Sequence, residues 1–302
     1  MSRRRRKGRV LNGLLLLDKP SGITSNLALQ KVKRIFNANK AGHTGSLDPL
    51  ATGLLVICFG RATKISNFLL TSDKRYQVQL KLGVTTDTGD ADGRVTGKQD
   101  ASAVTDAQIQ QAVRFLTGDV EQVPPMYSAL KHQGTRLYRL ARQGIEVERA
   151  SRTVSVYKLE ITKRDADRLH VDVHCSKGTY VRTLVEDLGK HLRCGAHVLE
   201  LRRTGLGPFN KPVMRTLTEL EKLADSDLCA LDQRLLPIDE ALQLWPALSF
   251  DESMMEEARN GHPVMMPEPL PSRVVRIYDA NDRFYGVGTV LEDGRIMPKC
   301  LR

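Results

Sequence analysis

The stretch AGHTGSLDPLATGLL, residues 41–55, joins a glycine-containing turn to an apolar run and places one carboxylate, Asp48, between them. Gly42 and Gly45 lack side chains, so the backbone here can pass close to a bulky neighbour. Pro49 has a fixed φ angle and also restricts the backbone of Asp48. A carboxylate held beside an apolar wall interacts more strongly with a ligand than one in water. The stretch therefore predicts a stiff loop that presents Asp48 and then enters a buried strand.

A plainer interpretation of Asp48 also exists. An aspartate followed by proline often begins a helix, with the aspartate as N-cap and the proline in the first turn. Taken alone, the Asp-Pro pair favours that cap by roughly two to one. His43 would likewise ordinarily be a loop histidine. The two glycines and the apolar run that follows shift the balance toward a functional loop.

The composition indicates a globular protein with a polyanionic partner. The chain has 302 residues, of which 41% are hydrophobic, enough for a large core or a large domain plus a small one. Its net charge is +11 and its pI is about 9.5. Such a charge is typical of proteins that bind polyanions, although a merely soluble basic protein would share it.

The cysteines and the N-terminus bear on the cellular setting. The five cysteines are scattered and contain no C-x-x-C pair, which argues against a disulfide framework or a structural zinc site. We therefore expect a reducing, cytoplasmic location. Residues 1–10 carry the run RRRRK and are expected to form a disordered basic arm. The run LLLL, residues 14–17, is too short to span a membrane, and no membrane association is expected.

Hydrophobic spacing predicts alternating strands and helices. The leucine run is expected to form a buried strand, followed by a helix with Ser25 as its N-cap. Residues 75–83 alternate strictly, which places Tyr76 on the core-facing side of a strand. Thr105 and Gln108 predict a capping box at the start of another helix.

The second half predicts further strands and a separate small module. Gly178 and Thr179 are expected to cap a helix that runs to about Arg193. After Pro246 the pattern changes to short strands, with a hairpin turn at residues 293–294. These elements predict an α+β protein with a curved sheet, a main domain at residues 11–247 and a small β-barrel-like domain at residues 248–302.

A second candidate cluster is CSKGTYVRTL, residues 175–184, in which Tyr180 and Arg182 flank a helix start. An arginine there could pair with a carboxylate and keep it ionised. A surface helix arginine is the simpler interpretation, and the sequence alone does not place Arg182 beside Asp48.

No metal or cofactor is expected. His170, Asp172 and His174 share one strand face, but an open strand face with polar groups is usually solvated, so a metal site is the less favoured interpretation. The acidic loop TDTGDADG has Thr88 and Gln99 where a calcium loop needs its first and twelfth ligands. Neither a P-loop nor a Rossmann fingerprint is present.

Five segments, taken in order, resemble the bacterial TruB-type tRNA pseudouridine synthases. They are LLLLDKPSGITS, GHTGSLDPLATGLL, RYQVQLKLGVTTDTGDADG, QVPPMYSALKHQGTRLYRLARQG and CSKGTYVRTLVEDLG. The resemblance implies the pseudouridine synthase fold, a curved mixed and mostly antiparallel sheet, followed by a PUA-like RNA-binding domain.

The resemblance also implies a reaction. Family members isomerise the T-loop uridine at position 55 of tRNA: the base leaves its ribose through N1, turns, and rejoins through C5. No atom is gained or lost, so no cofactor is implied. Asp48 matches the catalytic aspartate, which attacks a flipped nucleotide at either the ribose or the base ring.

Other site residues carry over one by one. Tyr76 matches the tyrosine that stacks on the target base and helps to remove the C5 proton. Tyr180 and Leu201 match pocket walls, and Arg182 matches the arginine that pairs with the aspartate.

Two further positions and the partners follow from the same resemblance. His43 matches a histidine near the flipped nucleotides, and Asp90 matches a position near the RNA. The implied partner is the T-arm of tRNA, bound by a monomer that needs no other protein.

The sequence leaves one alternative function open and disfavours a second. The chain could bind or fold RNA without using Asp48, since the tyrosines and arginines of residues 127–142 suit RNA binding in either case. A guide-RNA-dependent relative is disfavoured, because residues 122–144 match a block expected of stand-alone enzymes.

Overall fold

The computed structural model describes residues 8–266, 270 and 272–301. Its largest element is a nine-stranded sheet. Two of the nine strands are short: β2 (Ala41–His43) pairs with β3, and β13 (Phe209–Asn210) pairs with β12. The other strands, in order across the sheet, are β1 (Gly13–Lys19), β3 (Thr52–Phe59), β12 (Ala196–Leu206), β4 (Lys74–Leu82), β11 (Arg168–Cys175), β10 (Arg152–Asp165) and β7 (Gly118–Gln122).

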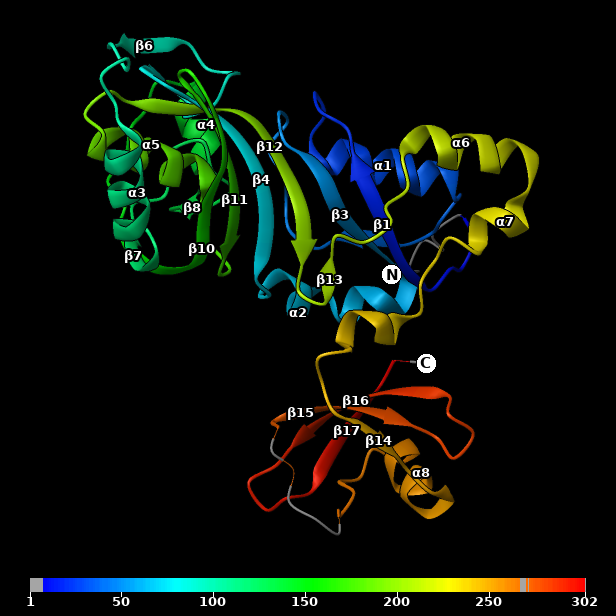
Figure 1. Cartoon of the computed structure of the whole chain (residues 1–302). Coiled ribbons are helices and arrows are strands. Elements are labelled where there is room, and N and C mark those ends of the chain that lie inside the picture. The colour runs from blue at the N-terminus through cyan, green and yellow to red at the C-terminus, as the bar shows by residue number, and fades with distance from the viewer. Residues whose placement is uncertain (1–7, 267–269, 271, 302) are drawn as a thin grey trace.

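The sheet is mixed but mostly antiparallel, which confirms the expected α+β class. The parallel pairing in it joins β3 to β12, through Thr52 opposite Arg202 and Gly53 opposite Arg203. β1 and β3 form one wing of the sheet, and β4, β11, β10 and β7 form the other wing (Figure 1). The loop that carries Asp48 leads directly into this junction, because β3 begins four residues after it.

The first wing ends in a buried edge strand, β1, and its burial is as the leucine run predicts. Leu15 and Leu17 of β1 pack in the main core, while Leu14 and Leu16 pack in a second cluster on the opposite face. Helix α1 (Ser25–Ile35) covers the main-core face, and α6 (Leu217–Ser226) and α7 (Leu228–Asp232) lie beside it. The second cluster is closed by the short helices η1 (Gly60–Lys64), α2 (Ser66–Leu70) and η2 (Ile238–Leu242).

The predicted N-cap of α1 is wrong by one residue. Thr24, not Ser25, is the cap, and its hydroxyl accepts a hydrogen bond from the Leu27 amide at 3.1 Å. Ser25 is buried and its hydroxyl bonds to Leu47 instead. Thr24 therefore caps the helix, because the Ser25 hydroxyl is already bonded to the Leu47 backbone.

The second wing confirms the alternation of β4, with Tyr76, Val78 and Leu80 buried in the main core. Helices α3 (Asp106–Phe115) and α5 (Val181–His191) cover this face, and α3 begins with the predicted capping box of Thr105 and Gln108. The hairpin β5 (Val84–Thr86) and β6 (Val95–Lys98) follows β4.

The predicted start of α5 is wrong. Tyr180 is its N-cap and makes no side-chain capping bond. The Thr179 hydroxyl donates to the Ser176 carbonyl at 3.1 Å, so it stabilises the preceding turn rather than the helix.

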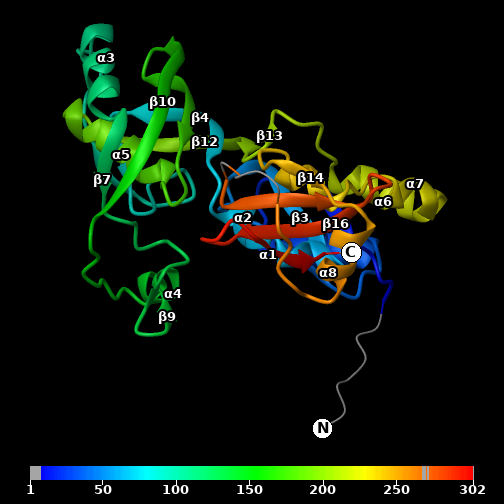
Figure 2. The same cartoon turned by 90° about the horizontal axis from the view of Figure 1, so that it is seen from below.

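Residues 123–151 form an insert between β7 and β10. The insert contains β8 (Lys131–His132), β9 (Thr135–Arg136) and α4 (Leu137–Arg142). Figure 2 shows α4 and β9 standing away from the sheet, beyond the ends of β7 and β10. The insert is therefore attached to the main domain at one side of the second wing.

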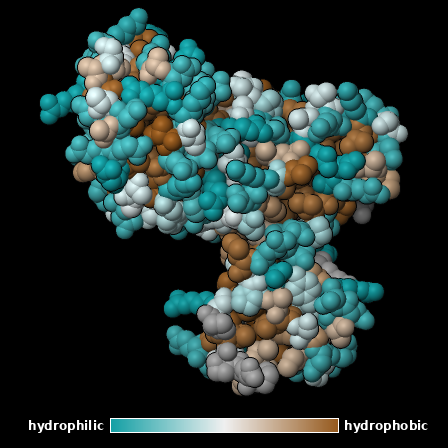
Figure 3. Space-filling model, in the orientation of Figure 1, coloured by the Kyte–Doolittle hydropathy of each residue, from teal (hydrophilic) through white to brown (hydrophobic). Residues whose placement is uncertain are grey.

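The C-terminal residues form a small sheet with its own core. Its strands are β14 (Ala247–Ser249), β15 (Val274–Tyr278), β16 (Phe284–Val290) and β17 (Ile296–Cys300), and α8 (Glu252–Arg259) packs on them. The predicted hairpin turn is present, with Gly294 at a φ of 82°. Val287 and Leu301 reach the second cluster of the first wing. Figure 1 shows this orange-to-red part below the main sheet, and Figure 3 shows hydrophobic residues near the junction.

The prediction of a disordered arm over residues 1–10 is wrong for Arg9. Residues 1–7 lie outside the described residues. The Arg9 amide bonds to the Asn37 carbonyl, and its guanidinium pairs with Asp232. Arg9 therefore belongs to the folded domain, because both its backbone and its charge find partners there.

The crossing of β3 and β12 generates a stability prediction. Gly53 has a φ of +92°, and an added Cβ would lie 2.3 Å from the Arg203 carbonyl oxygen. We expect Gly53→Ala to lower the free energy of unfolding by about 3 kcal/mol or more, since both backbone strain and a backbone clash oppose it. Gly118→Ala is the matched control, because Gly118 has a φ of +100° but no atom within 4 Å of the added Cβ.

For Gly118→Ala we expect the backbone cost alone, about 1–2 kcal/mol. Urea unfolding of both variants measures the difference. Equal losses at the two positions would show that the close approach of Gly53 to β12 is unimportant.

Candidate active site

The Asp48 loop, residues 44–51, contains no helix. The interpretation of Asp48 as a helix cap is therefore wrong. Instead the chain makes a tight turn in which the Ala51 amide donates to the Asp48 carbonyl at 3.1 Å. Leu47 and Ala51 are buried on either side, while 41% of the Asp48 side chain is exposed. The loop thus presents one carboxylate at the surface of an apolar wall.

Two side chains from the first wing hold this loop in place. The Ser25 hydroxyl accepts from the Leu47 amide at 2.7 Å and donates to the Leu47 carbonyl at 3.0 Å. The Lys19 ammonium is fully buried and donates to the Ala51 carbonyl at 2.7 Å and to the Pro49 carbonyl at 3.3 Å. Both sides of Asp48 are therefore fixed by bonds to backbone groups.

Arg203 lies on β12, the strand that joins the two wings, and it also binds the Asp48 loop. It is 1% exposed, and its Nε donates to the Leu54 carbonyl at 2.7 Å while its Nη2 donates to the Gly45 carbonyl at 3.2 Å. Sequence reasoning missed both Lys19 and Arg203. A signal was available for Arg203, because strand alternation puts it on the same inward face as Leu201.

Arg182 binds Asp48 and also the backbone of two other segments, the acidic loop and the insert. Its Nε lies 3.0 Å from Asp48 Oδ2, its Nη1 donates to the Thr88 carbonyl at 2.7 Å, and its Nη2 donates to the Tyr127 carbonyl at 2.8 Å. The Arg182 side chain is 5% exposed. The interpretation of Arg182 as a surface residue is therefore wrong: the first turn of α5 points its guanidinium into the site.

A second carboxylate shares this guanidinium. Asp90 lies in the acidic loop between β5 and β6, and its Oδ2 is 3.6 Å from Arg182 Nη1. It is 5% exposed, and its Oδ1 accepts from the Thr88 hydroxyl at 2.5 Å. Asp90 therefore contacts the site through Arg182, beneath the surface.

The ionisation of Asp48 is set by opposing effects. The protein packed around the carboxyl raises the pKa of Asp48, although part of the side chain remains exposed. The Arg182 charge lowers that pKa and the Asp90 charge raises it. The hydrogen bond from Arg182 and the Lys19 charge also lower it. Arg182 is thus the main group that keeps Asp48 ionised against its burial.

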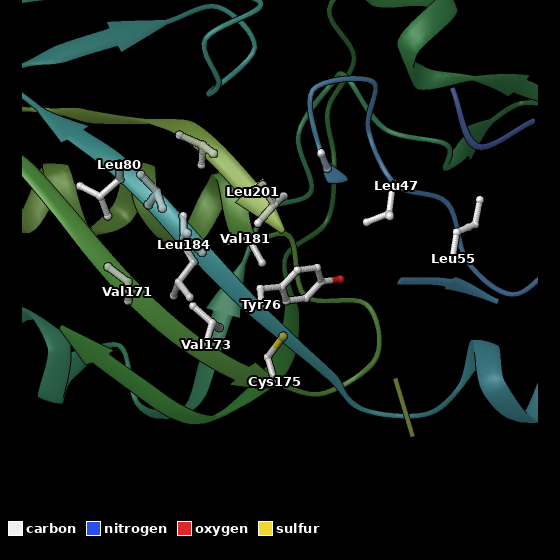
Figure 4. Close-up of a cluster of buried hydrophobic side chains, with 14 of the residues drawn as sticks. Leu47, Leu55, Tyr76, Leu80, Val171, Val173, Cys175, Val181, Leu184 and Leu201 are labelled. Atoms are coloured by element: carbon white, nitrogen blue, oxygen red, sulfur yellow. The ribbon is translucent and has the colours of Figure 1, made fainter. Parts of the chain in front are cut away.

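Tyr76 forms the floor of the site on β4. Burial raises the pKa of Tyr76 to about 12, and the charge of Arg203 and its hydrogen bond to the phenol oppose this rise. The phenol is therefore protonated at neutral pH. Figure 4 shows the Tyr76 ring beside Val181 and Leu201, with its hydroxyl directed toward the side of Leu47 and Leu55.

The remaining predicted residues lie around this floor. Leu201 is 7% exposed on β12, and Tyr180 is the half-buried residue before α5. His43 ends β2 at the start of the Asp48 loop, and its buried Nδ1 has no hydrogen-bond partner. Burial and the nearby Arg203 charge lower the pKa of His43, so it is neutral at pH 7.

This arrangement suits covalent catalysis on a planar group. Asp48 offers a carboxylate held by a buried cation, and Tyr76 offers a neutral ring within electrostatic range of it. Apolar side chains such as Leu201 and Val181 can exclude water from a ring stacked on Tyr76.

A hollow of about 600 Å³ lies against the polar side chains of the second wing and borders the site at Leu50 and Leu201. Gln77, Gln79, His170 and Asp172 line it, but Asp48, Tyr76 and Arg182 do not, so it is not the candidate active site. Among residues 8–266, 270 and 272–301, the structure contains no group of three or more His, Cys, Asp or Glu side chains that could hold a metal ion.

Comparison with known proteins gives one family throughout the chain. Residues 33–181 match the TruB family pseudouridylate synthase (N terminal domain). Residues 182–243 match the tRNA pseudouridylate synthase B C-terminal domain, and residues 246–301 match the pseudouridine synthase II TruB C-terminal model.

Two curated relatives and one solved structure are similar over nearly the whole chain. The tRNA pseudouridine synthase B of Nitrosococcus oceani is 51% identical over 99% of this chain and 97% of its own length. That of Stutzerimonas stutzeri is 51% identical over 100% of this chain and 99% of its own. A chain of a Cbf5-Nop10-Gar1 complex is 26% identical with a TM-score of 0.76, covering 97% of this chain and 86% of that one.

The electrostatics of the site generate a prediction for Asp48. Replacing Arg182 by methionine removes the charge and the hydrogen bond that lower the pKa of Asp48, so we expect that pKa to rise in Arg182→Met. The measurement is an NMR titration of ¹³C-carboxyl-labelled aspartate in the full chain.

Arg164→Met is the matched control, because Arg164 pairs with the remote Asp106. We expect this variant to titrate Asp48 as the wild type does. A titration of Asp48 that Arg182→Met leaves unmoved would show that the contact does not control its ionisation.

Proposed function

The chain belongs to the TruB family of pseudouridine synthases, and from that premise we propose that Asp48 is the nucleophile with which it acts. The protein is an enzyme that isomerises uridine in tRNA to pseudouridine. The observation that carries the assignment of Asp48 is its contact with the buried Arg182 at 3.0 Å, within electrostatic range of Tyr76.

The reaction is balanced without a co-reactant. The N1–C1′ bond breaks, the uracil turns, a C5–C1′ bond forms, and the C5 proton moves to N1 through exchange with a base or water. Asp48 forms a covalent bond to either the ribose or the base ring in the interval, so its carboxylate must be ionised and then released. Arg182 supports both requirements, because it stabilises the anion before attack and after departure.

The proposed target is the T-loop uridine at position 55, flipped out of its stack so that it reaches Asp48. Tyr76 would stack on the base with its neutral ring, while the half-buried Tyr180 and the buried Leu201 would form walls of the pocket. If Tyr76 also takes the C5 proton, Arg203 is the group that would stabilise the phenolate, since its charge and hydrogen bond lower the pKa of Tyr76.

Around the pocket, His43 and Asp90 have different proposed roles. His43, which is half-buried at the start of the Asp48 loop, would contact the RNA through the exposed part of its side chain. Asp90 acts from below, where it shares Arg182 with Asp48 and so helps to orient the guanidinium.

The substrate is tRNA, and we propose that a monomer binds its T-arm in the cytoplasm without another protein. The charge of +11 supports RNA binding. The insert adds exposed cations close to the site, namely Lys131, Arg136, Arg139 and Arg142. No helix in the described part of the chain is long and apolar enough to cross a membrane. The C-terminal sheet domain, for which we keep the boundary near residue 248, would contact a more distant part of the tRNA.

The alternative of RNA binding without catalysis is not favoured. A protein that only binds RNA does not require a carboxylate whose loop is fixed by Ser25 and Lys19 and whose charge is supported by Arg182.

Asp48→Asn tests the nucleophile. Asparagine keeps the size and hydrogen bonding of the side chain but cannot form the covalent bond, so we expect the single-turnover rate on T-arm RNA to fall by on the order of a thousand-fold or more. RNA affinity should stay near that of the wild type. Asp225→Asn, an exposed position on α6, is the matched control and should retain full activity. Normal turnover by a clean Asp48→Asn preparation would refute the assignment.

The salt dependence of binding tests the role of the charge. Each phosphate that the protein neutralises releases counterions, so we expect the affinity for tRNA to fall by about ten-fold or more between about 50 and about 200 mM salt. Dissociation constants measured across a salt series give the slope. An affinity that does not change with salt would contradict phosphate binding by the basic surface.

A further inference from the structure

Gln122 and Arg152 stand at the two ends of the insert. Gln122 is the last residue of β7 and Arg152 is the first residue of β10, and the two are paired directly across the sheet. The whole 123–151 insert therefore leaves and re-enters the sheet at this one pair.

The Gln122 side chain holds the backbone of Tyr180. It is 1% exposed, and its amide forms two hydrogen bonds with that one residue. Its Nε2 donates to the Tyr180 carbonyl at 3.1 Å, and its Oε1 accepts from the Tyr180 amide at 2.9 Å. A carboxamide bound in this way copies the pairing of a neighbouring strand, and it satisfies an N-cap residue that makes no side-chain capping bond.

Arg152 holds the ring of the same tyrosine. Its guanidinium carbon lies 5.0 Å from the centre of the Tyr180 ring, within the range of a cation–π contact. Its Nη2 also donates to the Gly178 carbonyl, two residues earlier in the turn. Gln122 thus fixes the backbone of Tyr180, and Arg152 fixes both its ring and the turn that precedes it.

We propose that Gln122 and Arg152 are positioning residues for the isomerisation, which act by holding Tyr180 in the wall of the nucleotide pocket. The inference rests on the proposed function, in which Tyr180 forms that wall. Neither residue touches Asp48 by any contact described above, so their effect passes through Tyr180 and through the adjacent Arg182 at the start of α5.

The location of this pair has a consequence for the insert. The insert contacts the site through the Tyr127 carbonyl, which accepts from Arg182. The insert begins directly after Gln122, which binds the Tyr180 backbone. A change in the position of the insert would therefore shift Tyr180 and Arg182 together. The pair therefore joins the placement of the insert to the geometry of the pocket.

The test uses the full chain, T-arm RNA and the variant Gln122→Met. Methionine has nearly the length and volume of glutamine, but it leaves the Tyr180 amide without its Gln122 partner and removes one of the two bonds to the Tyr180 carbonyl, which keeps the bond from the Leu184 amide. We expect the single-turnover rate to fall by about 10- to 100-fold, as a misplaced pocket wall would cause, while the dissociation constant for RNA changes by less than about three-fold. Gln111→Met, at an exposed position on α3, is the matched control and should behave as the wild type.

Two further variants keep the result interpretable if Gln122→Met is unstable. Gln122→Glu retains the acceptor for the Tyr180 amide but loses the donor to its carbonyl, so its rate should be intermediate. Arg152→Met removes the contact with the ring and should lower the rate without a matching loss of RNA affinity. Thermal unfolding of each variant separates these effects from a loss of folded protein.

A double-mutant cycle shows whether Gln122 acts through Tyr180. In a Tyr180→Leu background, we expect Gln122→Met to cause a smaller loss of rate than in the wild-type background, because the Tyr180 ring is gone and only the effect through Arg182 remains. Additive losses, or wild-type rates in both Gln122 variants, would overturn the inference while leaving the proposed function intact. Absence of pseudouridine from the wild-type reaction would instead refute the proposed function, and this inference with it.

Discussion

The pairing of Arg182 with Asp48 requires segments far apart in the sequence to meet at one point of the sheet. Burial raises the pKa of Asp48 and so opposes its ionised form, and the Arg182 charge counters part of that rise. The same guanidinium binds the carbonyls of Thr88 and Tyr127, so the acidic loop and the insert are fixed by the group that pairs with Asp48. A buried arginine with so many partners cannot change its orientation without leaving one of them unpaired, and an unpaired buried group is costly.

The junction of the two wings explains how a loop can carry an exposed carboxylate without being flexible. Lys19 from the first wing and Arg203 from the second both donate to backbone carbonyls of residues 45–54. Both cations are almost completely buried, and burial lowers the pKa of Lys19 to about 8. Their desolvation is offset by hydrogen bonds to backbone groups that would otherwise lack partners in the interior. Gly53 of β3 is paired with Lys19 of β1 and with Arg203 of β12, so the two cations flank the strand that the Asp48 loop enters.

Much of the fold, but less of the site, could be predicted from the sequence. The alternation of β4, the buried β1 and the capping box of α3 depend on local patterns, and the structure confirms each. The predictions were wrong where a side chain or loop has a tertiary partner. Ser25 does not cap α1 because its hydroxyl binds the Leu47 backbone. Asp48 does not begin a helix because Lys19 and Arg203 bind the backbone of its loop. The contact of Arg182 with Asp48 joins residues 134 positions apart, and no local pattern encodes it. The family resemblance identified Arg182 and Asp48 as partners, but it did not identify Lys19, Arg203 or Gln122 as site residues.

The most direct test of the account is a crystal structure of the full chain bound to a T-arm RNA that carries an unreactive analogue of the target uridine. The account predicts a flipped nucleotide stacked on Tyr76, with an Asp48 carboxylate oxygen about 3–3.5 Å from either C1′ of the ribose or C6 of the base. Arg182 should remain in contact with Asp48 in that complex. A target nucleotide still stacked in the T-loop, or one bound with a different side chain at the reacting carbons and Asp48 turned away, would contradict the account.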